Sequence, residues 1–377
     1  MKLSTFPGRV ALQQRVLPAY RTLLFDALAA ACRDGLCLFA GQPQIHENIT
    51  SAQGLQVATY VPARNRQLLK VGSPYYLLWQ LGLLRWLRDC DPTVLVVEAN
   101  SRYLSNRLAV RWMHARGRPV LGWGLGDPSR SRPLSRQGSL TALRDWERLS
   151  FLRSLDGVIA YSQRGAQEYR AADFPAERVF VALNAVAPRP AAPPAARPPG
   201  FTGPATVLFV GRLQARKRID LLIQACAALP RDLQPQLWIV GDGPARAELQ
   251  ALAVAVYPLA HFLGHRRGAE LGALFTAADL FVLPGTGGLA VQQAMAYGLP
   301  VIVAEGDGTQ DDLVRSSNGW RILPGDQDAL VDALKSALAD PERLRQMGDV
   351  SYRIVAEEIN LETMVDAFIK ALCTIIV

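Results

Sequence analysis

The chain has 377 residues, half of them apolar, with five cysteines and a formal net charge of +8. This length is enough for two cores of ordinary size, and five scattered cysteines without a CxxC pair argue against a disulfide-stapled scaffold and against a zinc site. Residues 1–190 carry 25 Lys and Arg against 13 Asp and Glu, and residues 191–377 carry 16 against 20, so +12 and −4 make up the total. The basic first half favours an anionic partner: nucleic acid, an anionic membrane surface or a phosphate-bearing substrate.

Helix and strand signals alternate through the first half. We expect strands where short apolar runs are bounded by turn residues, and helices where apolar residues recur every three or four positions. The expected strands are residues 9–14, 36–41, 93–98, 119–124 and 157–162. The expected helices are residues 17–32, 75–90 and 101–116.

A linker and a second alternating half follow. Residues 187–200, APRPAAPPAARPPG, are nearly all proline and alanine and indicate a stiff linker, because they cannot form a helix or a central strand. The strands expected after it are 206–211, 236–243, a short one near His261, 280–284 and 300–304. The helices expected between them are 218–229, 245–256, 268–278 and one around Gln293. Strands that are apolar throughout and joined by amphipathic helices predict a parallel sheet covered on both faces.

The predicted fold class is α/β, with two doubly wound Rossmann-like domains facing a cleft. The first domain is predicted to be residues 1–186 and the second residues 205–360, with 187–204 as the linker. Residues 361–377 are expected to form a C-terminal helix that packs back across the domain boundary. Ligands of such sheets bind beyond the carboxyl ends of the strands, so the turns after the strands are the candidate sites.

Two cations follow the first strand of the second half. In VLFVGRLQARKRIDLLIQA, Gly211 ends the strand, and Arg212 and Lys217 flank a turn that opens a helix. Fixed cations beside a helix N-terminus suit a diphosphate. A solvated basic turn is the alternative, because Arg216 and Arg218 lie in the same stretch.

Glycines mark two further turns. Gly241 and Gly243 follow the strand that ends in LWIV and suit a tight turn. In PGTGGLAVQQAMAYGLPVI an uncharged turn stands between a strand and a helix, so its backbone amides are able to cradle an anion or a hydroxyl. The residues of this turn are Gly285, Thr286, Gly287, Gly288 and Leu289.

These stretches in this order, with FLGHRRGAELGALFTAADLFVLP and NGWRILPGDQDALVDAL around the third, resemble the family 4 glycosyltransferases of the GT-B fold. The likeness covers residues 155–340. It implies that Arg212 and Lys217 grip the pyrophosphate of a nucleoside-diphosphate sugar. It also implies that His265 and Arg266 lie where the backbone reads the nucleotide base.

The sequence departs from this family at two glutamates. Gly285 stands at the first position and Gln293 at the second. Gln293 is still able to hydrogen-bond ribose hydroxyls. Gly285 offers no side chain, so the sugar hydroxyls are expected to meet the backbone amides of Thr286 to Leu289. The neutral turn is therefore predicted to hold a nucleotide sugar through its backbone; the alternative is that it holds nothing.

The first half supplies the candidate residues for the acceptor and the donor phosphate. Tyr20 and Arg21 lie at a helix start where this fold's acceptor and donor phosphate meet the first domain. Glu98 and Asp127 are the carboxylates best placed to face the cleft, either as a general base or charge stabiliser or as ordinary strand-end caps. Leu125 stands where the family often has a histidine, so no general base is assigned. The two histidines before the linker are expected to have surface or packing roles.

Arginine and tryptophan gather on two of the expected helices. Such amphipathic helices suit an anionic bilayer surface, and core packing with a solvated face is the alternative. The tryptophans are Trp79, Trp86 and Trp112, and the arginines beside them are Arg85, Arg88, Arg107 and Arg111. No aromatic-basic stacking motif is present, so nucleic acid is not an expected partner.

The expected function is that of a hexosyl- or glycosyltransferase, which moves a sugar from a nucleoside-diphosphate sugar to a hydroxyl acceptor without metal or other cofactor. The resemblance implies retention of configuration, and a lipid-linked or polysaccharide acceptor is expected. The start, MKLSTFPGRV, has no signal-peptide pattern and no apolar run predicts a membrane span, so a cytoplasmic protein, peripheral on the inner face of the plasma membrane, is expected. A catalytically impaired nucleotide-binding GT-B partner protein and a nucleotide-sugar epimerase are the alternatives.

Overall fold

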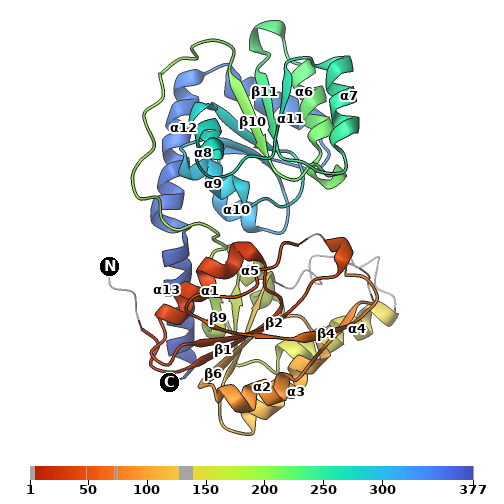
Figure 1. Cartoon of the computed structure of the whole chain (residues 1–377), viewed down its shortest axis with the longest axis vertical. Coiled ribbons are helices and arrows are strands. Elements are labelled where there is room, and N and C mark those ends of the chain that lie inside the picture. Colours follow the sequence, from red (N-terminus) through yellow and green to blue (C-terminus); the bar gives the residue numbers. More distant parts are fainter. Residues whose placement is uncertain (1–4, 48, 72, 74, 127–138, 377) are drawn as a thin grey trace. The chain divides into compact units, whose positions relative to one another are not determined.

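The chain forms two α/β units, drawn in Figure 1 from a computed structural model. The structure describes residues 5–47, 49–71, 73, 75–126 and 139–376. One unit contains the described chain up to Val186 and again from Leu361 onward, and the other is Ala187–Asn360. The last helix of the chain is therefore part of the first unit.

A parallel sheet forms the centre of the first unit. Among the described residues it has seven strands in the order β3-β2-β1-β6-β7-β8-β9. Residues 94–97 of β6 are apolar and fully buried, as a strand covered on both faces requires. The strands are β1 (Val10–Val16), β2 (Leu36–Gly41), β3 (Thr59–Pro62), β6 (Val94–Glu98), β7 (Val120–Gly124), β8 (Gly157–Ala160) and β9 (Val179–Val181).

Helices cover both faces of this sheet (Figure 1). On one face α13 packs against α1, β8 and β9, and Phe368 meets Trp123 of β7 edge-on with ring centroids 5.0 Å apart. The Ala185 amide also donates to the Met364 sulfur at 3.4 Å. These contacts make α13 an integral part of the first unit. The helices are α1 (Thr22–Ala30), α2 (Leu83–Cys90), α3 (Leu104–His114), α4 (Ser139–Leu152), α5 (Gln163–Ala171) and α13 (Leu361–Ile375), with short 3-10 turns η1 (Ala19–Arg21), η2 (Ile45–Glu47) and η4 (Ala176–Arg178).

A hairpin replaces the first part of the helix expected at residues 75–90. Strand β5 (Leu77–Leu81) pairs antiparallel with β4 (Arg64–Leu68), and Gly82, with φ 87°, separates β5 from α2. Alternate side chains of β5 are buried, which is the period of a strand. The helix prediction is therefore wrong before Gly82 and correct for α2.

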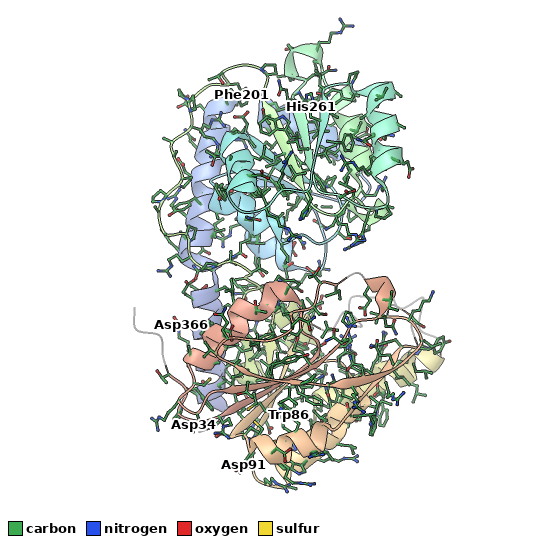
Figure 2. The ribbon with its side chains drawn as sticks, in the orientation of Figure 1. Asp34, Trp86, Asp91, Phe201, His261 and Asp366 are labelled. Carbon is green, nitrogen blue, oxygen red and sulfur yellow. The ribbon has the colours of Figure 1, made fainter. Side chains whose placement is uncertain are left out.

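The tryptophans that were expected beside arginines on two helices do not form an exposed surface together. Trp86 of α2, labelled in Figure 2, is 5% exposed and stacks on Phe39 with centroids 5.0 Å apart. Trp112 of α3 packs against the core and lies under the Arg116 guanidinium, 3.8 Å from the ring centroid. Trp79 is on β5 and not on a helix. The two helices therefore do not present the expected tryptophan face, and contact with a membrane stays a prediction. No helix in the described parts of the chain is both long and apolar enough to cross a membrane.

The second unit is built around another parallel sheet, with six strands in its described residues in the order β12-β11-β10-β13-β14-β15. Residues 280–283 of β13 and 301–304 of β14 are apolar and at most 1% exposed. The strands are β10 (Thr206–Val210), β11 (Gln236–Val240), β12 (Ala260–Gly264), β13 (Leu280–Leu283), β14 (Val301–Ala304) and β15 (Gly319–Ile322). The helices are α6 (Ile219–Ala227), α7 (Arg246–Val256), α8 (Gly268–Ala277), α9 (Ala290–Ala296), α10 (Thr309–Leu313), α11 (Gln327–Leu338) and α12 (Pro341–Arg353), with short turns η5 (Ala215–Lys217), η6 (Arg231–Leu233) and η7 (Ile354–Glu358).

Arg197 and Arg345 attach the proline-rich stretch to the second unit, and Arg345 does so by donating to the Pro198 carbonyl at 2.9 Å. Residues 187–205 form no helix or strand. The Arg197 guanidinium donates to four carbonyl oxygens, which lie at the C-terminal ends of α8 and α9, where the helix dipole favours a cation. These are the carbonyls of Phe275 (2.9 Å), Ala278 (3.1 Å), Tyr297 (2.9 Å) and Gly298 (3.1 Å). Burial, with the neighbouring Arg345, lowers the pKa of Arg197 to about 10, so it stays charged at neutral pH.

Replacing Arg197 with methionine is expected to lower the free energy of unfolding by about 2–4 kcal/mol, because four carbonyls lose a charged donor. Urea unfolding followed by circular dichroism measures this loss. The matched control is Arg231→Met, in the same unit, because Arg231 is exposed and its side chain has no partner among the described residues. The control should change stability by less than about 0.5 kcal/mol. Equal effects of the two substitutions would mean that Arg197 does not anchor the linker.

Candidate functional site

The carboxyl ends of the central strands of the second sheet meet at one edge. Strand β10 lies between β11 and β13, and all of these strands run parallel. The Gly211 amide donates to the Val240 carbonyl at 3.0 Å, and the Gly241 amide donates to the Gly264 carbonyl at 2.8 Å. The turns after three neighbouring strands therefore lie side by side, at the edge where sheets of this class bind ligands.

Two of the predicted donor-binding glycines allow two backbone segments to touch. Gly241 has φ 132°, and a Cβ there would stand 1.9 Å from the Gly211 carbonyl oxygen. A Cβ at Gly243 would stand 2.3 Å from the Leu213 carbonyl oxygen. Any ligand contact made at Gly211, Gly241 or Gly243 is therefore a backbone contact.

Lys217 is buried beneath the turn that follows β13. Its ammonium donates to the Thr286 carbonyl at 2.8 Å and to the Gly287 carbonyl at 2.6 Å, and the residue is 6% exposed. Burial, with a further contribution from Arg216, lowers the pKa of Lys217 to about 8. Lys217 therefore fixes the neutral turn, a role that the motif alone does not predict.

No side chain fits at Gly285. A Cβ there would lie 2.3 Å from the Arg216 carbonyl oxygen and 2.4 Å from the Lys217 carbonyl carbon. The 215–217 turn thus occupies the space that a glutamate side chain at this position would need. The Thr286 amide donates to the Arg216 carbonyl at 3.1 Å, so Thr286 cannot belong to the predicted cradle of amides. The solvent-accessible amides of the turn that donate to no acceptor within the described chain are those of Gly287, Gly288 and Leu289.

Arg212 is a cation without a protein partner. It is exposed, and its side chain makes no hydrogen bond or ion pair with any residue that the structure describes. The neighbouring cations are engaged: Arg218 pairs with Asp220 at 3.1 Å, and Arg216 donates to Gln214 at 3.0 Å. The guanidinium of Arg212 is therefore available for bidentate contact with a phosphate.

His265 and Arg266 follow β12, where the resemblance puts the nucleotide base. His265 accepts a hydrogen bond from the Arg267 guanidinium at 2.6 Å, and Arg266 lies 3.5 Å from Glu270. Both side chains are exposed and engaged locally. The backbone of these residues would therefore make any contact with the nucleotide base. This contact stays a prediction.

Gln293 is the exposed member of a glutamine pair in α9. Its neighbour Gln292 is buried and donates to the Ile359 carbonyl at 2.6 Å. Gln293 has no hydrogen-bond partner in the described residues. Its amide is free for a ligand, and the predicted ribose contact stays a prediction.

The lowered pKa of Lys217 predicts a pH dependence of anion binding. A lysine is charged below its pKa, so the charge of Lys217 is lost as the pH rises through about 8. Because the second ionisation of a phosphate, with a pKa of about 6, is by then complete, the charge of the diphosphate group stays constant. We expect the affinity for a nucleoside diphosphate to fall by roughly 5- to 10-fold between about pH 7 and about pH 9.5. Calorimetric titration at several pH values measures this affinity. The Lys217→Met variant should bind the nucleoside diphosphate weakly and with the same affinity at each pH. If its affinity fell with pH as that of the parent does, a group other than Lys217 would be responsible for the pH dependence.

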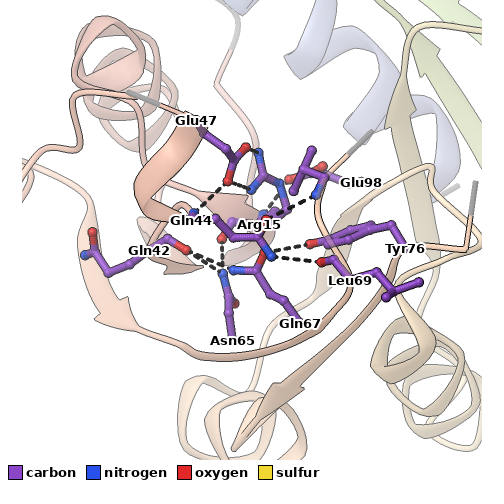
Figure 3. Close-up of polar contacts among 10 residues, drawn as sticks. Arg15, Gln42, Gln44, Glu47, Asn65, Gln67, Leu69, Tyr76 and Glu98 are labelled. Carbon is purple, nitrogen blue, oxygen red and sulfur yellow. Dashed lines mark hydrogen bonds and ion pairs between the residues drawn. The ribbon is translucent and has the colours of Figure 1, made fainter. Parts of the chain in front are cut away.

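A polar network occupies the carboxyl edge of the first sheet (Figure 3). Arg15, in β1, pairs with Glu47 through two hydrogen bonds of 2.8 and 2.7 Å. Glu98, at the end of β6, accepts the Arg15 amide and a hydrogen bond from the Tyr103 hydroxyl. Burial raises the pKa of Glu98 above its ordinary value. Glu98 is therefore a partly buried carboxyl group that is fixed by hydrogen bonds, and it keeps its proton more readily than a surface glutamate.

One pattern in strand β1 indicates this network. In VALQQRV three polar residues, 13–15, stand consecutively in an otherwise apolar central strand. Gln13 is fully buried; it donates to Gln80 at 2.6 Å and accepts from the Glu98 amide at 3.1 Å. A run of polar residues at the carboxyl end of a buried strand indicates a polar network, because each buried group needs a partner.

Arg21 is engaged within the first unit. It is 7% exposed, donates to the Asn184 side chain at 2.7 Å, and its guanidinium lies 5.3 Å from the Trp123 ring and 5.5 Å from the Tyr161 ring. The predicted phosphate or acceptor contact stays a prediction. Tyr20 is 45% exposed and stays a candidate. Asp127 lies outside the described residues.

A groove of about 720 Å³ lies at the opposite, amino edge of the first sheet. Its lining includes Asp91, His114, Arg118 and Asp156. His114 lies 2.8 Å from Asp156, which also accepts the Val120 amide at 2.7 Å. His114 thus has the packing role expected of it. Within the described residues no group of three or more His, Cys, Asp or Glu side chains is placed to hold a metal ion.

Comparison with protein families matches residues 196–353 to the model described as glycosyl transferases group 1. A curated relative, the GDP-mannose-dependent alpha-mannosyltransferase of Mycolicibacterium smegmatis, is 40% identical over 139 residues, which are 36% of this chain and 35% of that protein. The chain spans 28% to 44% of the length of the first curated relatives that it matches. The similarity to glycosyltransferases is confirmed at the level of group 1, and assignment to family 4 stays a prediction.

Solved structures match the whole chain. The apo form of the lipopolysaccharide outer core galactosyltransferase WaaB has a TM-score of 0.68 at 16% identity and covers 97% of this chain and 99% of its own. Anabaena Alr3699/HepE in complex with UDP has a TM-score of 0.67 at 18% identity, with 97% and 99% covered. These likenesses confirm the predicted fold class, two Rossmann-like units of the GT-B kind.

Proposed function

We propose that this protein is a glycosyltransferase that moves a sugar from a nucleoside-diphosphate-sugar donor to a hydroxyl acceptor. One observation carries the proposal. The part of the chain that matches group 1 glycosyl transferases presents Arg212 without a protein partner, at the same strand edge as Lys217 and the three free amides of residues 287–289.

The proposed role of this edge is to stabilise the leaving diphosphate. When the bond between the sugar and the diphosphate breaks, negative charge grows on the phosphate oxygens. Arg212 supplies a guanidinium for those oxygens and Lys217 a nearby ammonium, and fixed charges of this kind lower the barrier most where charge develops. Neither residue needs a metal for this role, and we propose a metal-independent reaction.

The proposed donor contacts follow from the same geometry. The free amides of Gly287, Gly288 and Leu289 suit phosphate or sugar oxygens, and Gln293 suits the ribose hydroxyls. The backbone at His265 and Arg266 is proposed to meet the base. Since no carboxylate can stand at Gly285, the sugar is held by backbone groups and not by an acidic side chain.

The acceptor side of the proposal involves Glu98 and Tyr20. Glu98 holds its proton more readily than usual, which suits exchange of a proton with an acceptor hydroxyl. We propose retention of anomeric configuration and assignment to family 4, as the resemblance implies. We also propose that the acceptor is lipid-linked or a polysaccharide. The proposed location is cytoplasmic, at the inner face of the plasma membrane. The likeness to a lipopolysaccharide galactosyltransferase supports this acceptor class.

The experiment that tests the proposal has two stages. Titration of UDP, GDP, ADP and TDP by calorimetry identifies the nucleotide that binds. The matching nucleotide sugars are then incubated with the protein, and released nucleotide is measured with and without a mixture of hydroxyl acceptors. Binding followed by turnover supports a transferase; no binding of any of the four nucleotides would contradict it.

A nucleotide-binding partner protein without catalysis is the second candidate. The absence of space for a carboxylate at Gly285 and the engagement of Lys217 by Thr286 and Gly287 favour it. It predicts tight nucleotide binding without release of nucleotide from any sugar donor. The second stage of the experiment therefore separates the two candidates.

A further inference from the structure

The hairpin of β4 and β5 turns one face to solvent. Its register pairs Arg64 with Leu81, Arg66 with Trp79, and Leu68 with Leu77. Directly paired residues of two strands, and every second residue along each strand, share one face. We name these six residues the ribbon face. Leu68, Trp79 and Leu81 are 58%, 39% and 40% exposed, the two arginines are exposed and Leu77 is half-buried.

The opposite face of the hairpin is fixed to the rest of the first unit (Figure 3). Asn65 donates to the Arg15 carbonyl at 2.8 Å, and Gln80 donates to Asn65 at 2.9 Å. Gln67 donates to the Gln42 carbonyl at 3.4 Å. An isolated two-stranded hairpin is marginally stable in water. These bonds therefore hold the ribbon face outward in a single register.

Packing does not explain the apolar residues of the ribbon face. Trp79 and Leu81 alternate with buried Leu78 and Gln80, so the strand pattern requires only that they point away from the core. The exposed apolar surface continues at the end of β4, where Leu69 is 51% exposed. Single exposed apolar residues are common, but a contiguous apolar patch marks an interaction site.

The surface is also cationic. Between Glu47 and Asp89 the sequence has no acidic residue and five basic ones: Arg64, Arg66, Lys70, Arg85 and Arg88. On the ribbon face the arginines stand directly opposite Leu81 and Trp79. The arrangement therefore places a positive charge beside each of two exposed apolar side chains, without a carboxylate on the same face.

We propose that the ribbon face docks on a bilayer of anionic phospholipid. Tryptophan and leucine enter the interface between head groups and acyl chains, where Trp79, Leu81 and Leu68 would lose their contact with water. Arg64 and Arg66 would bind lipid phosphates around them. A nucleic acid would satisfy the arginines but would leave the leucines in water, so the apolar content favours a membrane. The proposal deepens the membrane location proposed above by naming the docking surface, and it does not depend on sugar transfer.

Sedimentation with vesicles tests the proposal on the full chain. We expect the protein to sediment with vesicles of phosphatidylcholine and phosphatidylglycerol and not with phosphatidylcholine alone. Added salt should weaken the binding, because it screens the attraction of the arginines to the lipid phosphates.

Substitutions in the ribbon face locate the surface. Arg64→Gln with Arg66→Gln is expected to weaken vesicle binding by about 25-fold, at about five-fold for each basic residue. Trp79→Ser with Leu81→Ser is expected to weaken it by at least about ten-fold. The matched controls are Arg170→Gln with Arg231→Gln, and Leu259→Ser with Leu323→Ser, which change exposed residues of the same types elsewhere. The controls should bind vesicles like the parent.

The proposal would be overturned if the protein did not bind the anionic vesicles, or if the ribbon variants and the control variants lost binding equally. It would also be overturned if the protein bound a single-stranded oligonucleotide and not vesicles, and if the ribbon variants abolished that oligonucleotide binding. Circular dichroism checks that each variant is folded. Nucleotide affinity should be unchanged in all of them, because the proposed nucleotide site is in the other unit. A protein that docks on vesicles and binds no nucleotide would refute only the proposed sugar transfer.

Discussion

Arg212→Ala is expected to lower the affinity for the nucleoside diphosphate by about 10- to 100-fold. Arg212 has no partner among the residues that the structure describes, so its hydrogen-bonding capacity is available to the phosphates, and bonds to a charged group contribute about 1.5–3 kcal/mol. Calorimetry with the nucleotide that binds the parent measures the loss. The corresponding nucleoside, which has no phosphate, should bind parent and variant with equal affinity.

Two control variants test whether this loss is specific. Arg231→Ala removes an exposed arginine of the same unit and should leave the affinity unchanged. Glu98→Ala removes a carboxyl group that is not proposed to contact the phosphates, and it should also leave diphosphate affinity nearly unchanged. If Arg212→Ala binds the diphosphate as tightly as the parent, the assignment of this strand edge to the donor phosphates is wrong.

Gly285→Ala is expected to reduce both stability and nucleotide binding. The added Cβ would lie 2.3 Å from a carbonyl oxygen of the 215–217 turn, and backbone cannot yield there as a flexible side chain would. Displacing the turn costs about 1–3 kcal/mol of unfolding free energy. It also moves the Thr286 and Gly287 carbonyls away from Lys217, so we expect diphosphate affinity to fall by more than about ten-fold. Urea unfolding and calorimetry measure the two effects.

Gly203→Ala is the control, because a Cβ at Gly203 meets no atom within 4 Å. It should change stability by less than about 0.5 kcal/mol. Gly285→Glu, which introduces the glutamate that the family usually has, should be at least as damaging as Gly285→Ala. Faster turnover in Gly285→Glu would contradict the steric account and would mean that the turn has room for a carboxylate.

Apolar runs were sufficient to predict the central strands of both sheets but not β3, β9 and β15, and the reason for the success is visible in β13 and β14. Every residue of LFVL and VIVA is apolar, and the two strands are buried on both faces, so local composition and tertiary environment agree. The prediction failed at β5 because LLWQL has apolar residues at spacings that suit a helix as well as a strand. Pairing with β4, which is distant in sequence, decided the outcome.

The strand edge of the second unit was predictable from its motifs, but its internal contacts were not. Lys217 reaches a carbonyl 69 residues later in the chain, and this contact exists only because β10 folds beside β13. The burial of Arg21 was not predictable for a similar reason. Its partner Asn184 is 163 residues away, and no local pattern signals that a helix-start arginine will be buried beside two aromatic rings that stack on each other.

The return of α13 to the first unit affects the order in which the chain matures. Residues 187–360 leave the ribosome before residues 361–377, so the second unit has all of its residues while the first still lacks the helix that carries Phe368 and covers Trp123. The first unit to be started is thus the last to be finished. A fragment ending at Val186 would expose the surface that α13 covers, and an isolated first unit requires residues 361–376 to be joined to it by a new connection.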